Sequence, residues 1–316
     1  MRRSHLFAIL KIAVGTGLIL LLIHITPIAD VARTLKNANI FYLLVSAALY
    51  LFALLLGPLR WSRLLSVKGI HLSLRRVISY FFIGFFFNNF LPTIVGGDVA
   101  RATYAGLESG KKSEAFAATV VDRTVGFLAL TMIVLFITLG SSHFGLDREI
   151  FVVPVVIIVL VTAGVSLFFN SKVFNKLTAG LGRIRFFNLG QRVANLYSSI
   201  YSYREEKSTC LLAFLLSIGL QSGLIAANYT LGYSVGIRIS PLYYFLFIPI
   251  IAFMSMIPLS PNAIGIRESG YMLLFCQVGV TKSQAMSLSV LNLSLVLLSS
   301  LIGGVIFLFY RGRLKL

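Results

Sequence analysis

Two interrupted apolar segments carry charged and helix-breaking residues in the same order. The first contains Asn89, Pro92, Gly96, Gly97, Asp98 and Arg101, and the second contains Pro258, Asn262, Gly265, Arg267 and Glu268. In each segment a proline ends a long apolar run, and an arginine follows the proline at the same spacing. Paired, interrupted segments in the two halves of a chain point to the binding site of a transporter.

The residues at these breaks are suited to binding an anion. Gly96 and Gly97 expose backbone N–H groups where a second half-helix begins, and a helix N-terminus favours negative charge. Asn262 and Gly265 can play the same part in the second segment. With Arg101 and Arg267 facing each other, such a site would suit a phosphate headgroup. The alternative is structural: Asp98 caps a helix, and the two arginines pair only with Asp98 and Glu268.

A further pair of charged residues, Asp122 and Arg123, falls inside the apolar stretch 115–139. Ionisable residues within membrane spans are functional candidates by default because their burial is costly. The alternative interpretation is a buried structural pair. We include both residues in the predicted substrate-binding set.

The elements that position these residues are predicted to be membrane helices. Hydrophobic residues make up 58% of the 316 residues and charged residues only 12%, whereas soluble domains carry about 25% charged residues. Stretches long enough to span a bilayer lie near 6–26, 40–57, 115–139, 150–169, 209–231 and 285–309. Two further apolar stretches, 77–91 and 241–257, run into the breaks.

The distribution of basic residues predicts the topology. The formal net charge is +18, and the basic residues cluster in 58–76, in 170–208 and in the C-terminal tail, as is typical of cytoplasmic loops. These segments all lie inside if 77–91 enters the membrane and returns, and if the region 241–279 forms a similar hairpin from the outside. Eight complete crossings would keep the same loop orientation and remain the alternative.

We therefore predict an all-α integral membrane protein, a polytopic helical bundle built as an inverted repeat with two re-entrant hairpins of broken helices. Residues 1–316 would form a single transmembrane domain with pseudo-repeat halves at about 1–140 and 145–316. The first apolar run is interpreted as a retained signal-anchor helix. We expect a multi-pass protein of the plasma (inner) membrane with both termini in the cytoplasm.

Other function classes lack support in the sequence. The two cysteines and four histidines show no metal-ligand spacing, and no phosphate-binding loop or hydrolase motif is present. We expect no metal, no cofactor and no catalytic residues. The basic residues are spread over several loops rather than gathered on one domain, so we expect no nucleic-acid partner.

Three runs of this chain resemble the lysylphosphatidylglycerol synthase transmembrane-domain family, also called the flippase-like family. These runs are Asn89-Phe90-Leu91-Pro92 with Gly96-Gly97-Asp98 and Arg101, then Val121-Asp122-Arg123, then Ile257-Pro258 with Gly265 and Arg267-Glu268. The resemblance covers roughly residues 8–310. It implies a membrane domain that translocates an aminoacylated phospholipid. In the best-known members this domain precedes a cytoplasmic aminoacyltransferase domain, which we expect this chain to lack.

The sequence thus favours a non-enzymatic lipid transporter. Its partner would be an anionic or aminoacylated membrane phospholipid, or a polyprenyl-phosphate lipid. Two alternatives remain open: a membrane-anchoring subunit for a separately encoded transferase of the phosphatidylglycerol lysyltransferase type, and an intramembrane enzyme that acts on lipid phosphates. Against the enzyme, the breaks contain no nucleophile–base pair.

Overall fold

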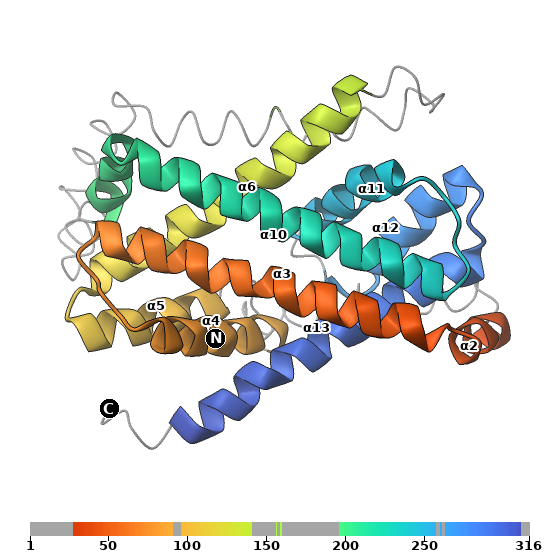
Figure 1. The fold of residues 1–316 in the computed structure, drawn as a ribbon, viewed down its shortest axis with the longest axis horizontal. Helices are drawn as coiled ribbons and strands as arrows, with labels where there is room; N and C mark the ends of the chain where they lie inside the picture. The colour runs from red at the N-terminus through yellow and green to blue at the C-terminus, as the bar shows by residue number, and fades with distance from the viewer. Residues whose placement is uncertain are drawn as a thin grey trace, which may run out of the picture. The chain divides into compact units, whose positions relative to one another are not determined.

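The structure is a computed structural model that describes residues 28–90, 96–140, 156, 159, 196–256, 260 and 263–310. These residues form helices and no strand (Figure 1). The helices are α2 (Ile28–Lys36), α3 (Ile40–Val67), α4 (Leu74–Phe90), α5 (Gly96–Ser109), α6 (Lys112–Gly140), η3 (Ser202–Glu205), α10 (Lys207–Ser234), α11 (Pro241–Met254), α12 (Ile266–Phe275), η5 (Cys276–Val278) and α13 (Lys282–Tyr310).

Four of the described helices, α3, α6, α10 and α13, are long and apolar enough to cross a membrane. They coincide with four of the predicted spans, because an uninterrupted apolar run of this length satisfies its backbone polar groups only as a helix. The structure confirms an all-α membrane protein. The predicted span 6–26 lies outside the described residues, and of 150–169 only residues 156 and 159 are described.

Helix α3 is longer than the span expected over 40–57. It continues through Pro58 to Val67, over 28 residues. A proline inside a membrane helix is tolerated because neighbouring groups satisfy the carbonyl that it leaves free. The expectation that 58–76 forms a basic loop is therefore wrong for its first part, and Arg60 lies within a helix.

The two breaks separate shorter helices. Helix α4 ends at Phe90 and α5 begins at Gly96, whereas α11 ends at Met254 and α12 begins at Ile266. Residues 91–95, 257–259, 261 and 262 lie outside the described residues, and Pro92, Pro258 and Asn262 are among them. Re-entrant hairpins and the inverted repeat stay predictions.

The chain forms two compact units. Unit 1 comprises Met1–Ala53, Phe86–Gly96 and Ser222–Ile302, and unit 2 comprises Leu54–Phe85, Gly97–Gln221 and Gly303–Leu316. Each unit combines three separate segments of the chain.

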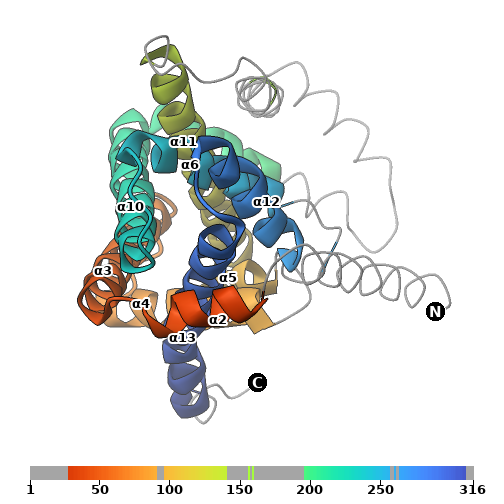
Figure 2. The same cartoon turned by 90° about the vertical axis from the view of Figure 1, so that its right-hand side faces the viewer.

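In unit 1, small residues allow helices to approach closely. A Cβ on Gly223 of α10 would lie 2.7 Å from the Cβ of Ala53 in α3, and the Ser46 hydroxyl donates a hydrogen bond to the Ala227 carbonyl at 2.7 Å. The first half of α3 therefore runs antiparallel to the second half of α10, and the two ribbons lie side by side in Figures 1 and 2. Helix α11 packs on α12.

In unit 2, α4 and α5 also meet at a glycine. A Cβ on Gly84 would lie 2.7 Å from the carbonyl oxygen of Gly97 and 3.2 Å from the Cβ of Arg101. This contact fixes the first turns of α5 against α4. Together with α3 and α6, these two helices surround the charged cluster described next.

Candidate functional site

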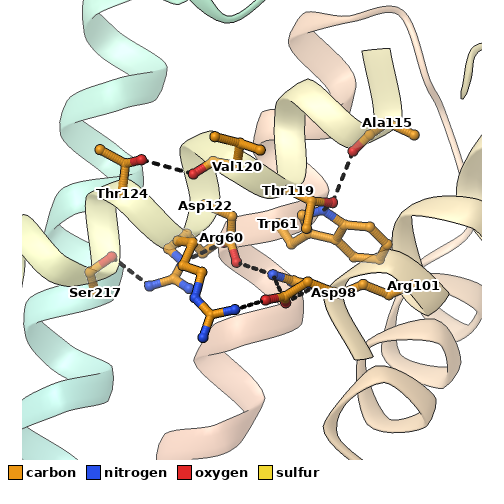
Figure 3. Close-up of polar contacts among 11 residues, drawn as sticks. Arg60, Trp61, Asp98, Arg101, Ala115, Thr119, Val120, Asp122, Thr124 and Ser217 are labelled. Atoms are coloured by element: carbon orange, nitrogen blue, oxygen red, sulfur yellow. Dashed lines mark hydrogen bonds and ion pairs between the residues drawn. The ribbon is translucent and has the colours of Figure 1, made fainter. Parts of the chain in front are cut away.

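Ion pairs join charged side chains from three helices in the interior of unit 2 (Figure 3). They are Arg60 of α3, Asp98 and Arg101 of α5, and Asp122 and Arg123 of α6. Three arginines and two aspartates carry one net positive charge. Charges buried inside a protein require such pairing, because little water is available there to solvate them.

Asp122 is the centre of this cluster. Its Oδ1 accepts a hydrogen bond from Arg60 Nε at 2.6 Å, and its Oδ2 accepts one from Arg101 Nη2 at 2.9 Å. Only 1% of Asp122 is exposed. One carboxylate thus serves two guanidinium groups, each through a single oxygen.

Asp98 is shared in the same way. Its Oδ1 pairs with Arg101, at 2.9 Å from Nη2 and 3.1 Å from Nε. Its Oδ2 accepts a hydrogen bond from Arg123. The i,i+3 pairing of Asp98 with Arg101, which the structural interpretation of the sequence expected, is therefore present. Asp122 and Arg123 pair with other members of the cluster.

Arg101 is held from several sides. Its Cζ lies 5.0 Å from the ring centroid of Trp61 and 5.3 Å from that of Phe81, within the range of a cation–π contact. Only 5% of the residue is exposed. Its Nη1 is buried and has no hydrogen-bond partner among the described residues. A guanidinium nitrogen left in this state is costly, because a buried donor to which no partner is bound keeps its full desolvation penalty.

Arg60 is fixed by two further contacts. Its Nη1 donates to the hydroxyl of Ser217 on α10 at 2.8 Å, and that hydroxyl donates in turn to the Ala213 carbonyl. Gly126 lies one turn after Asp122 on α6, and a Cβ built there would lie 3.4 Å from Arg60 Nη1. Helix α6 thus supplies both the charge and the space that Arg60 needs.

The second predicted arginine has a different environment, in unit 1. Arg267 pairs with the adjacent Glu268, whose Oε1 lies 2.9 Å from Arg267 Nη2 and 3.4 Å from the Ser289 hydroxyl. The other carboxylate oxygen accepts the backbone N–H of Gly265 at 2.6 Å. Glu268 therefore caps α12, and the Gly265 N–H that the sequence suggested for an anion is donated to this carboxylate.

The structure brings five of the predicted residues into one place, namely Gly97, Asp98, Arg101, Asp122 and Arg123. Gly265, Arg267 and Glu268 form the group in unit 1. Asn89 lies half-buried in the last turn of α4, and Gly96 begins α5. Roles for all of these residues in binding substrate stay predictions.

Sequence reasoning missed three residues of this site: Arg60, Trp61 and Ser217. Arg60 was counted among loop charges because the predicted span ended at residue 57. A signal was present in the buried Asp122, which needs a cationic partner that Arg123 cannot supply from the neighbouring position of a helix. Among the described residues, no group of three or more His, Cys, Asp or Glu side chains could hold a metal ion.

Comparisons with known proteins identify relatives over nearly the whole chain. The sequence model described as "Lysylphosphatidylglycerol synthase TM region" matches residues 8–308. A UPF0104 membrane protein from Pyrococcus horikoshii is 26% identical over 96% of this chain and 98% of its own length. A UPF0104 membrane protein from Methanothermobacter thermautotrophicus is 22% identical over 99% of this chain and 94% of its own. No solved structure matches.

Proposed function

Because the chain belongs to the lysylphosphatidylglycerol synthase transmembrane-region family, we propose that it moves a phosphate-bearing lipid between the leaflets of the plasma membrane. The lipid is an anionic or aminoacylated phospholipid, or a polyprenyl phosphate. Arg101 contacts its phosphate group. Both chain termini face the cytoplasm in this proposal.

The observation that carries the proposal is the unused nitrogen of Arg101. Its Nη1 is buried and unpartnered among the described residues, whereas Nε and Nη2 are held by the two aspartates. An arginine whose Nε and Nη2 are held in place keeps Nη1 as a buried donor that still needs an acceptor. Phosphate oxygens are strong acceptors for guanidinium groups, and such charge-assisted bonds are short and strong.

The placement of this arginine also supports transport. Arg101 lies in the second turn of α5, and helix N-termini attract phosphate. Discontinuous helices form substrate sites in many transporters, because their ends supply polar backbone groups near the bilayer midplane. The headgroup would cross at this depth while its acyl chains remain in the lipid.

Reconstituted vesicles provide the test. Purified protein in liposomes should accelerate the transfer of a fluorescently labelled anionic phospholipid between leaflets, followed by its accessibility to an added quencher. Arg101→Ala should abolish the acceleration. Arg101→Lys should restore only part of it, because lysine keeps the charge but lacks the planar fork. Arg63→Ala is the matched control, since Arg63 is exposed on the helix that carries Arg60.

Two outcomes would count against the proposal. If the parent protein gives no acceleration with any phosphate-bearing lipid, the chain does not transport these lipids. If Arg101→Ala and Arg63→Ala transport equally well, Arg101 is not the phosphate contact. Circular dichroism and size-exclusion profiles would verify that each variant is folded.

A further inference from the structure

The buried cluster in unit 2 contains one arginine whose role the proposed function leaves unexplained. We propose that Arg60 is a positioning residue that keeps one positive charge on Arg101 uncompensated, so that the site selects a singly charged phosphate group. The inference deepens the proposed function and rests on it for the identity of the site. It follows from how two carboxylates are divided among three guanidinium groups.

Arg60 occupies one of the two carboxylate oxygens of Asp122. It takes Oδ1 at 2.6 Å, so that Asp122 reaches Arg101 through Oδ2 alone. A carboxylate and a guanidinium otherwise prefer a bidentate pair with two parallel hydrogen bonds. Without Arg60, Asp122 could turn both oxygens to Arg101, and the cluster would become neutral. Arg60 prevents this pairing although it does not itself face a ligand.

Two nitrogens of Arg60 are already engaged with other side chains. Its Nε is donated to Asp122 and its Nη1 to Ser217, and only 7% of the residue is exposed. Gly126 lies close to its guanidinium. Arg101, in contrast, retains a buried nitrogen with no partner among the described residues. The two arginines therefore have separate roles, one holding the carboxylate and one meeting the anion.

The net charge of the cluster then limits the ligand. A single negative charge neutralises the site, whereas a doubly charged group leaves one negative charge buried. A zwitterionic headgroup brings its own cation into a cluster that already contains three. Uncompensated charge in a low-dielectric interior is costly. The preferred ligand is a phosphodiester monoanion, whether on a lipid headgroup or as a free ion.

A single tryptophan reports on this site without a transport assay. Trp61 is the only tryptophan of the chain, its ring lies 5.0 Å from Arg101 Cζ, and its Nε1 donates to Thr119 at 3.1 Å. An anion that binds Arg101 should change the emission of Trp61. The probes are short-chain phosphatidylglycerol, phosphatidic acid and phosphatidylcholine, with dimethyl phosphate as the free phosphodiester. At mildly alkaline pH a phosphomonoester such as phosphatidic acid carries close to two charges.

We expect the parent to bind phosphatidylglycerol more tightly than phosphatidic acid or phosphatidylcholine. Arg60→Gln should weaken phosphatidylglycerol binding by about tenfold or more, the size expected for a lost charge-assisted contact. The double variant Arg60→Gln with Asp122→Asn restores one net positive charge and should recover binding to within about threefold of the parent. A purely structural role for Arg60 predicts that a second substitution makes binding worse. Arg63→Gln should bind like the parent.

The inference is overturned if Arg60→Gln binds phosphatidylglycerol as tightly as the parent. It is also overturned if the double variant binds phosphatidylglycerol as weakly as Arg60→Gln. If Arg60→Gln does not fold, Asp98→Asn decides, because it leaves the shared carboxylate of Asp122 in place. It raises the net charge of the cluster by one and should shift the preference toward phosphatidic acid. An unchanged preference would contradict the inference.

The two proposals can fail separately. Selective binding of phosphatidylglycerol without leaflet exchange would leave this inference standing and remove the transport proposal. Dimethyl phosphate that binds as tightly as the lipid would identify a free anion as the ligand. If the parent transports lipid normally and Arg60→Gln binds phosphatidylglycerol like the parent, the inference about Arg60 is wrong and the transport proposal stands.

Discussion

Arg101 and Arg267 follow the two prolines at the same spacing, yet carboxylates balance their positive charges in different ways. Arg101 shares two carboxylates with two other arginines, whereas Arg267 pairs with Glu268 on the same turn. A one-to-one pair leaves no net charge at that position, and the cluster in unit 2 retains one. At the residue scale, only the first arrangement leaves a positive charge that no carboxylate of the group balances.

Asp122 should be the residue of this cluster on which stability depends most. Asp122→Ala leaves Arg60 and Arg101 without their shared carboxylate, and breaking a buried pair in this way costs about 3–5 kcal/mol. Unfolding by denaturant in detergent micelles measures this change. Asp30→Ala is the control, because Asp30 pairs with Arg33 at the surface of α2 and surface pairs contribute about 0–1 kcal/mol. Equal losses in the two variants would contradict the central role of Asp122.

At the scale of elements, the site depends on how closely α4 approaches α5. Gly84 makes this approach possible, because a Cβ at that position would meet the Gly97 carbonyl oxygen at 2.7 Å, and a backbone atom cannot move aside cheaply. Phe81 of α4 also contacts the guanidinium of Arg101. A shift of α4 would therefore change the support of Arg101 as well as the packing.

Gly84→Ala should destabilise the protein by about 1–3 kcal/mol, the usual cost of overpacking. It should also alter the Trp61 emission, since Arg101 would move relative to the ring. Gly140→Ala is the matched control in α6, where an added Cβ meets no atom of the described residues within 4 Å. A Gly84→Ala variant that is as stable as Gly140→Ala would show that α4 and α5 have room to separate.

The end of α3 is held by a contact with η3 within unit 2. The Tyr203 hydroxyl donates to the Leu64 carbonyl at 2.7 Å, in the last turn of α3, where carbonyls lack intrahelical partners. Gly69 then reverses the chain with a φ of +64°. Burial raises the pKa of Tyr203 above its usual range, so its hydroxyl remains a donor even at alkaline pH. The segment 196–205 therefore packs on protein through Tyr197, Ile200 and Tyr203, all of which are buried.

Tyr203→Phe should loosen this segment without unfolding the helices. The loss of one buried hydrogen bond costs about 1 kcal/mol, so amide hydrogen exchange over 196–206 should become about fivefold faster. Tyr201→Phe is the control, because its hydroxyl accepts a hydrogen bond from the exposed Arg204. Unchanged exchange in Tyr203→Phe would mean that ring packing alone holds the segment.

At the scale of the whole molecule, the predicted topology assigns opposite sides of the membrane to the ends of α3. Asn37 precedes α3 and His71 follows it, and both residues are exposed. With Cys210 and Cys276 replaced by serine, a cysteine at position 37 should react with an impermeant thiol reagent added to intact cells. A cysteine at position 71 should react only after the cells are opened, because basic loops are retained inside. The reverse labelling pattern would invert the topology.

The amino-acid sequence by itself determined the class of the protein and most of its charged site. Helices α3, α6, α10 and α13 follow from apolar runs, since bilayer thickness sets their length. Asp98, Arg101, Asp122 and Arg123 were identifiable because a charge inside an apolar segment is expensive and needs a reason. The pairing of Asp98 with Arg101 was also predictable, because residues three apart face each other on a helix.

Only the tertiary structure decided which charges meet. Asp122 pairs with Arg60, 62 positions away, and Arg60 reaches Ser217, 157 positions away. Sequence spacing specifies neighbours within one helix, but contacts between helices depend on rotation about each axis and on how closely the backbones approach. The packing of α3 and α5 against α6 turned Arg60 from an apparent loop charge into a buried partner of Asp122. In this arrangement two carboxylates serve three guanidinium groups, and Nη1 of Arg101 has no hydrogen-bond partner in the part of the chain that the structure describes.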